Sequence, residues 1–298
     1  MSTEARSAEA RAGWLMTAPA LAAIGLFFFV PAIASLALSF TDFDIYALAD
    51  ISNLRFAGFD NYARLFGNPL FWTALGNTAW FVVLGVPLLV ALSLGAALLV
   101  HARTVRWRPL WRVALFAPFV TTLVATAVVW RYLLHTRYGL INYALGAVGI
   151  GPIDWLGDPH ASLPAILLFV AWKSFGYNMM IFLAALQTVP RELEEAALID
   201  GANAWQRFRH AVLPTIAPTM LLVAILTVAG MFQLFAEPYV MTQGGPSQST
   251  VTVLYFMYEE GFKWWNLGSG AAVAVVLFLL IVAVTMVQVR LARGSRAL

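Results

Sequence analysis

The chain has 298 residues, of which 61% are hydrophobic and 11% are charged, with a formal net charge of +3. An ordinary soluble domain holds about 45–50% apolar and about 25% charged residues, so this composition excludes an ordinary water-soluble fold. The sequence contains no cysteine, which excludes a disulfide framework and a cysteine-based metal site. Because the apolar residues occur in blocks longer than a soluble core needs, we expect an integral membrane protein.

Six apolar segments follow one another along the chain. Each is long enough to cross the hydrocarbon layer as a helix of about 20 residues. Strands with open edges would leave backbone N–H and C=O groups unpaired in lipid. We therefore expect an all-α, polytopic membrane helical bundle with about six transmembrane helices. They are predicted at residues 14–40, 71–100, 112–134, 162–186, 216–240 and 268–291.

The first segment allows a second interpretation. Two arginines precede an apolar run that reaches residues 32–34 (Ala-Ile-Ala), a pattern similar to a signal-peptidase site. Pro31 lies close to that site, and the apolar stretch continues to Phe40. Both features favour a retained helix, with residues 1–13 as a tail before it and residues 41–70 as an external loop after it.

The distribution of basic residues predicts the orientation, because short loops rich in Lys and Arg stay in the cytoplasm. With the N-terminus inside, twelve arginines fall on the cytoplasmic side and five basic residues on the other, while Lys173 lies inside a span. Both termini, including the tail at residues 292–298, are therefore expected in the cytoplasm. The cytoplasmic set is Arg6, Arg11, Arg103, Arg106, Arg108, Arg112, Arg191, Arg207, Arg209, Arg290, Arg293 and Arg296, and the opposite set is Arg55, Arg64, Arg131, Arg137 and Lys263.

Residues 187–215 form a long loop on the predicted cytoplasmic side. Pro190 suits the first turn of a helix, glutamates follow where the helix dipole is positive, and Gly201 provides a stop. Asn203 can cap a second helix, with a glutamine three positions later completing a capping box and Pro214 limiting its length. The loop is expected to form a helix, a glycine turn and a second helix.

The two expected helices carry apolar surface that is too small to fold alone and needs a partner. That partner is either the ends of the chain's own spans or a separate protein, and spacing alone favours the chain's own spans. The apolar side chains concerned are Leu193, Ala196, Ala197, Trp205 and Phe208.

The same loop resembles the EAA loop of ABC importer permeases, whose pattern is EAA, three residues, G, nine residues, I, one residue and LP. The match runs without a gap, except that Ala211 stands at the isoleucine position, which predicts one weaker apolar contact. The resemblance implies that the first helix docks on a cytoplasmic ATPase subunit and transmits its closure to the spans. The ATPase-coupling residues it implies are Glu195, Ala196, Ala197, Asp200, Gly201, Ala202, Phe208, Leu213 and Pro214. Glu195 either pairs with the ATPase or only complements the helix dipole.

Other segments are similar to the carbohydrate group of these permeases, which includes maltose, lactose and glycerol-phosphate permeases. They are the fourth span around Trp172, Gly176 and Tyr177, residues 242–250 (TQGGPSQST), and residues 39–43 with 56–62. The resemblance implies a type I ABC importer transmembrane fold over residues 71–291, in a bacterial-type cytoplasmic (inner) membrane.

The resemblance also implies the partners. They are the lipid bilayer, a second permease subunit, an extracytoplasmic solute-binding protein, and two copies of a cytoplasmic ATPase subunit that hold ATP and Mg. We expect no nucleic acid and no cofactor on this chain, which has no GxxxxGK[ST] loop because neither Lys173 nor Lys263 follows such a glycine.

Polar residues inside membrane spans are costly, so they indicate where a solute pathway is to be sought. Ser174 and Lys173 are three and four residues from Tyr177 and share one helical face with it. Lys173 can also snorkel to the surface or pair with Glu237. Tyr177, Thr227 and Met231 match site positions of the maltose-type permease, although the apolar Met231 weakens the case for maltose itself. The candidate pathway residues are Trp172, Lys173, Ser174, Tyr177, Asn178, Thr227, Met231, Gln233 and Glu237.

Three alternatives to a sugar importer predict different features of the sequence. An importer for a non-sugar solute such as glycerol 3-phosphate stays open, although nine of the fifteen acidic residues fall on the predicted outer side. A self-contained secondary transporter should show an inverted repeat, which we do not see in the sequence. A membrane enzyme needs a clustered nucleophile, base or metal set, but the four histidines are scattered and form no HExxH motif.

Overall fold

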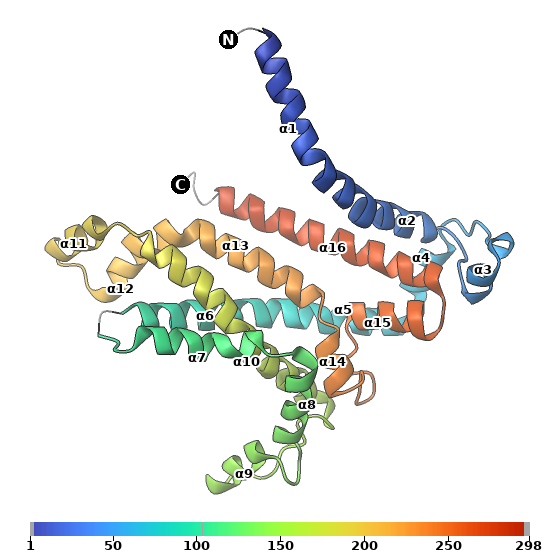
Figure 1. Cartoon of the computed structure of the whole chain (residues 1–298). Coiled ribbons are helices and arrows are strands. Elements are labelled where there is room, and N and C mark those ends of the chain that lie inside the picture. The colour runs from blue at the N-terminus through green and yellow to red at the C-terminus, as the bar shows by residue number, and fades with distance from the viewer. Residues whose placement is uncertain (1–2, 103, 295–298) are drawn as a thin grey trace. The chain divides into compact units, whose positions relative to one another are not determined.

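The computed structural model describes residues 3–102 and 104–294, and their regular structure is helical apart from one isolated bridge between Thr41 and Phe56. The expected all-α membrane fold is therefore confirmed (Figure 1). Arg103 and Arg296, two of the predicted cytoplasmic arginines, lie outside the described residues. The chain forms two units: unit 1 runs to Gly67 and includes Met257–Val276, and unit 2 comprises Asn68–Phe256 and the described residues from Leu277.

Unit 1 begins with one long helix made of α1 (Thr3–Ile24), η1 (Gly25–Phe29) and α2 (Val30–Leu38). The most apolar stretch of this helix is exposed throughout, as expected of a segment that faces lipid. The short helices α3 (Ile45–Ala49), η2 (Ile51–Asn53) and α4 (Asp60–Gly67) follow, and η5 (Glu259–Lys263) and the start of α16 (Leu267–Gly294) complete the unit.

Asn61 holds the segment after α2 in place within unit 1. Its side-chain Nδ2 donates to the carbonyl oxygens of Ser39 at 2.8 Å and Thr41 at 2.7 Å. Arg64 Nη2 donates to Asn61 Oδ1 at 2.6 Å, and the Gly268 N–H donates to Phe43 O at 2.8 Å. These buried bonds fix the loop that the sequence marked as similar to an external loop of carbohydrate permeases.

Unit 2 is built around α10 (Pro159–Gln187), whose side chains are largely buried and which packs against α6 (Val86–His101), α7 (Arg108–Val120) and α13 (Leu213–Phe232). The other elements of unit 2 are α5 (Pro69–Trp80), η3 (Phe81–Gly85), α8 (Leu123–Leu133), α9 (Leu140–Ala147), α11 (Arg191–Ile199), α12 (Ala204–Arg207), η4 (Phe208–Val212), α14 (Ala236–Met241) and α15 (Val253–Tyr258). Helices α11 and α12 lie at one end of α10 and α13, whereas α8, α9 and α14 lie at the other end (Figure 1).

Three prolines follow π-helical turns in this chain. The turns η1, η3 and η4 precede Pro31, Pro87 and Pro214, each of which lies at the start of the next α-helix. Proline has no N–H and its ring crowds the carbonyl four residues earlier, and a wider turn relieves that conflict without ending the helix. The prediction that Pro214 limits the second helix of the loop is therefore wrong, because one helix runs from Ala204 to Phe232.

Five helices of the described residues are long and apolar enough to cross a membrane, and a bent pair adds a sixth span if it is counted as one. These five are Gly13–Leu38, Pro69–His101, Pro159–Gln187, Ala204–Phe232 and Leu267–Ala292. The sequence predicts one helix at 112–134, but the structure has two, α7 and α8. They are bent by 96° relative to one another at Thr121 and Thr122. The expected helix at 216–240 also ends early, at Phe232, and α14 is separate.

Candidate functional site

The turn between α11 and α12 is a Schellman motif. The Ala202 N–H donates to Ala197 O at 2.9 Å, and the Gly201 N–H donates to Leu198 O at 3.0 Å. Gly201 has a φ of +75°, a region that costs L-residues about 1–2 kcal/mol. A Cβ at Gly201 would meet nothing within 4 Å, so glycine is needed here for its backbone conformation and not for space.

The second helix of the loop starts with the expected capping box. The Gln206 N–H donates to Asn203 Oδ1, and the Asn203 N–H donates to Gln206 Oε1, both at 2.9 Å. Two donors that would otherwise lack partners at the helix start are thus satisfied by side chains. The local sequence therefore determines the geometry on both sides of Gly201.

The two halves of the loop differ in how they pack. On the second half, Phe208 is half-buried, and Ala211 and Val212 are buried; Val212 belongs to a cluster with Leu186 and Ile216. On the first half, α11 is exposed along most of its length, and Ile199 is 87% exposed. The second half therefore packs closely against the chain's own spans, as spacing alone favoured for the whole loop, whereas α11 contacts η4 and α12 and stays mostly exposed.

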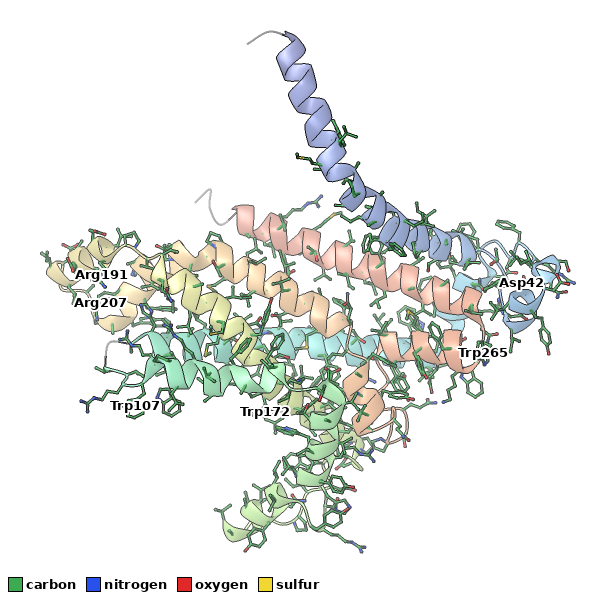
Figure 2. All side chains as sticks on the ribbon, in the orientation of Figure 1. Asp42, Trp107, Trp172, Arg191, Arg207 and Trp265 are labelled. Atoms are coloured by element: carbon green, nitrogen blue, oxygen red, sulfur yellow. The ribbon has the colours of Figure 1, made fainter. Side chains whose placement is uncertain are left out.

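The predicted coupling residues are divided between these halves. Arg191 at the start of α11 and Arg207 on α12 mark this end of unit 2 in Figure 2. The exposed members of the set are Glu195, Ala196, Asp200, Gly201 and Pro214, and the half-buried members are Ala197, Ala202, Phe208 and Leu213.

A cavity of about 210 Å³ lies inside unit 2 and is called the inner cavity below. It gathers side chains from α6, the end of α7, the middle of α10, α13 and α14, which are distant in sequence. Among its described lining residues, Glu237 is the one with an acidic side chain. The predicted pathway residues that line it are Ser174, Tyr177, Asn178, Thr227, Met231 and Glu237.

Aromatic and hydrogen-bonding groups meet in the inner cavity. The Tyr177 ring stacks on Phe119, with the ring centroids 4.7 Å apart and the planes at 21°. Asn178 Nδ2 donates to Thr227 Oγ1 at 3.1 Å, and the Thr227 hydroxyl donates to Val223 O at 2.7 Å. Asn178 and Thr227 are buried and each fixes the other, so polar atoms are held at set positions on the wall.

Lys173 does not line the inner cavity. Its Nζ donates to Thr121 O at 2.7 Å, to Pro118 O at 3.1 Å and to Thr121 Oγ1 at 3.4 Å. Lys173 is 7% exposed, so it does not snorkel to the surface, and it lies within 4.0 Å of no carboxylate oxygen in the described part of the chain. Lys173 satisfies carbonyl groups that the bend after α7 leaves without helical partners.

Gly176 brings α7 close to α10. A Cβ at this position would collide with the Leu115 carbonyl, so a residue with a side chain would push α7 away. Gly176 and Lys173 together hold the end of α7, which carries Phe119, next to Tyr177. Sequence reasoning missed Phe119, and the signals that could have suggested a break near it are Pro118 and the pair Thr121-Thr122 within an apolar segment.

Trp172 and Gln233, the other two candidates, lie away from the inner cavity. The Trp172 ring packs on Trp130, with centroids 5.4 Å apart, and is marked beside α10 in Figure 2. It also borders an apolar groove formed with α6. Gln233 is exposed at the C-terminal cap of α13.

An all-α bundle of apolar spans, with a cavity that carries several polar side chains and an exposed helix–glycine–helix loop at one end, is typical of the membrane component of a transport system. The chain belongs to the family described as "Binding-protein-dependent transport system inner membrane component", which matches residues 11–297. It is a multi-pass permease subunit of an ABC importer and not an enzyme. The alternatives of a self-contained secondary transporter and of a membrane enzyme are therefore wrong.

Similar proteins include transport permeases named for sugars. The chain is 35% identical to the lactose transport system permease protein LacF of Rhizobium radiobacter over 305 residues, covering 99% of this chain and 100% of LacF. It is 34% identical to the sulfoquinovosyl glycerol transport system permease protein SmoG of Agrobacterium fabrum over 280 residues, covering 94% of this chain and 88% of SmoG.

A solved structure shows the same fold. A chain of a bacterial ABC transporter involved in the import of the acidic polysaccharide alginate superposes with a TM-score of 0.79. The sequence identity is 20%, and the match covers 96% of this chain and 97% of the alginate transporter chain. The expected type of importer fold is therefore confirmed.

Proposed function

We propose that this chain is one of two permease subunits that form the pathway for a sugar or a related solute. The observation that carries the proposal is the inner cavity, which is lined by Tyr177, the Ser174 side chain and the Asn178–Thr227 pair. Aromatic faces and fixed polar groups suit a ligand with an apolar ring face and many hydroxyls. The similarity to LacF supports the same solute class.

No basic residue is among the described residues that line the inner cavity, which favours a neutral solute over an anionic one. Glu237 lines the cavity, whereas Lys173 directs its ammonium group to Pro118 and Thr121. A carboxylate accepts hydrogen bonds from hydroxyl groups but repels a phosphate or a second carboxylate. Glycerol 3-phosphate and acidic sugars are therefore the less favoured solutes.

The exposed half of the loop is the proposed contact with the ATPase subunits. Leu193, Leu198 and Ile199 are exposed apolar residues on α11, which the chain's own spans leave uncovered. A stable protein interface has an apolar centre, and exposed apolar side chains in such a cluster are typical of one. ATP and Mg would be held by two separate ATPase subunits, and an extracytoplasmic binding protein would deliver the solute.

The orientation follows from the distribution of charge. Cytoplasmic loops are rich in Lys and Arg, and the end of unit 2 with α11 and α12 carries Arg191, Arg207 and Arg209. In the proposed arrangement this loop and both tails, residues 1–13 and 292–298, face the cytoplasm of the inner membrane. The end of unit 2 that carries α8, α9 and α14, together with the loop at residues 41–70, faces the outside.

The solute class is tested with the complete importer in proteoliposomes. We expect ATP hydrolysis to rise when the binding protein presents a neutral sugar from a panel that includes lactose, maltose and arabinooligosaccharides, with glycerol 3-phosphate as the anionic comparison. If no carbohydrate stimulates hydrolysis, the sugar assignment is wrong while the assignment to the importer family stands.

The orientation is tested by labelling. The chain has no cysteine, so Ala202→Cys introduces a single thiol in the turn of the loop. A membrane-impermeant maleimide should label it only after the inner face of the membrane is made accessible. Labelling from outside intact cells would contradict both the orientation and the contact with a cytoplasmic ATPase.

A further inference from the structure

A second cavity, called the outer cavity below, lies in unit 2 at the end opposite α11. Its volume is about 530 Å³, and its walls come from the end of α8, the turn after it, the segment before α10 and the end of α14. Small-molecule pockets measure roughly 300–1,000 Å³, so in this conformation the outer cavity has room for a ligand, whereas the inner cavity, at about 210 Å³, must widen before it holds the solute. None of the candidate pathway residues lines the outer cavity.

The walls of the outer cavity are held together by buried hydrogen bonds. Asn142 is 7% exposed and its Nδ2 donates to Thr136 O at 3.1 Å and to Ile153 O at 2.8 Å. Its Oδ1 accepts from Trp155 Nε1 at 2.9 Å and from the Ile153 N–H at 3.2 Å. The amide therefore uses both its donors and its acceptor, and it joins the turn after α8 to the segment before α10.

A further bond and a glycine fix the shape of the same walls. Thr136 Oγ1 donates to Asp154 Oδ1 at 2.8 Å across the two segments. The Gly139 N–H donates to His135 O at 2.9 Å, and a Cβ at Gly139 would collide with the carbonyl oxygens of Leu133 and His135. The turn is closed tightly enough to require glycine, so the side chains that it carries have defined positions.

The lining of the outer cavity combines aromatic rings with charges of both signs. Tyr132 and Tyr138 are exposed, and the Tyr138 ring stacks on His135. Arg131 and Asp154 are exposed polar groups on facing elements of the same cavity. Tyrosine rings offer a flat surface to the apolar face of a sugar ring, and guanidinium and carboxylate groups bond to its hydroxyls.

Buried apolar side chains of one cluster border both cavities, and this cluster is called the apolar layer. Leu134 and Met241 line the outer cavity, Met231 and Leu234 line the inner cavity, and all four belong to one buried cluster. A sugar is strongly hydrated, so it does not cross such a layer unless the helices around it separate. A solute that reaches the outer cavity is therefore held outside the layer in this conformation.

From this geometry we infer that the outer cavity is a second saccharide site, which holds one or two sugar rings released by the binding protein before the apolar layer opens. The inference rests on the proposed sugar transport and adds a second site to the same path. The inner cavity receives the solute afterwards. Tyr132 and Asp154 are the residues that contact the sugar.

The test uses the complete importer in lipid nanodiscs without ATP, with its binding protein loaded with a diazirine derivative of lactose or maltose. After illumination, we expect mass spectrometry to find the label on residues 131–138 or 154–156. Tyr132→Ala and Asp154→Asn should each reduce this labelling severalfold. The matched control is Tyr143→Ala, because Tyr143 is an exposed tyrosine on α9 that does not line the outer cavity.

Two further measurements separate the possible outcomes. Uptake by the Tyr132→Ala and Asp154→Asn variants should be slower, whereas their affinity for the unloaded binding protein should equal that of the unchanged chain. Reduced affinity for the unloaded binding protein would show that the outer cavity contacts protein and would overturn the inference. Normal uptake and labelling in both variants would overturn it too, while sugar-stimulated ATP hydrolysis by the unchanged importer would show that the sugar assignment still holds.

Discussion

The loop at residues 187–215 and the inner cavity are built in different ways. The loop takes its geometry from neighbours in sequence: a glycine, a capping asparagine and the residues within five positions of them. The inner cavity takes its geometry from residues on α6, α7, α10, α13 and α14, which lie up to about 150 positions apart. A single change should therefore act locally in the loop but should disturb several helices at once around the cavity.

The largest expected effect is on the coupling of ATP hydrolysis to solute uptake. Gly201→Asp places an L-residue at a φ of +75°, at a cost of about 1–2 kcal/mol, and Glu195→Lys reverses an exposed charge on α11. Both variants should insert normally, hydrolyse ATP and lose uptake almost completely. The measurement compares uptake with hydrolysis in proteoliposomes, and normal uptake in both variants would count against the coupling role.

The next largest effect is expected at Lys173. Lys173→Met removes the donor to the Pro118 and Thr121 carbonyls. The Pro118 carbonyl keeps the Thr121 hydroxyl as a donor, so the main cost is the loss of the bond to the Thr121 carbonyl, about 1–3 kcal/mol. The thermal unfolding temperature of the purified chain should fall. Lys173→Arg keeps a donor and should lose less stability, so equal losses in the two variants would show that the carbonyl bonds do not matter.

A smaller effect is expected on solute choice. Glu237→Gln keeps the size of the side chain but removes the acidic group that lines the inner cavity. Stimulation of ATP hydrolysis by an anionic sugar should improve relative to a neutral sugar, because the repulsion is lost. If the ratio between the two sugars stays the same, Glu237 does not select the solute by charge.

The smallest effect is expected at the capping box. Asn203→Ala removes the bond to the Gln206 N–H, and such caps contribute about 0.5–2 kcal/mol. Uptake should decrease slightly, with a larger decrease at higher temperature. Gln206→Ala removes only the reciprocal bond to Asn203 and should have a still smaller effect. A complete loss of uptake in Asn203→Ala would show that the cap does more than stabilise the helix.

The same contrast explains what the sequence could predict. The helix, the glycine turn and the capping box at Asn203 were predicted because each depends on residues a few positions apart. The bend after α7 was not predicted. The carbonyl groups that this bend exposes are bound by Lys173, which is about fifty residues away in the sequence. Phe119 was missed for the same reason, since its contact with Tyr177 exists only after α7 and α10 have packed.

The proline at position 214 has a mechanical consequence. Because η4 accommodates it, the helix from Ala204 to Phe232 has 29 residues without a break, and at about 1.5 Å per residue it is roughly 44 Å long. In the proposed coupling, a displacement near Trp205 is passed along this helix to Thr227 and Met231, which line the inner cavity. A hinge at that proline would absorb the displacement, whereas the widened turn passes it on.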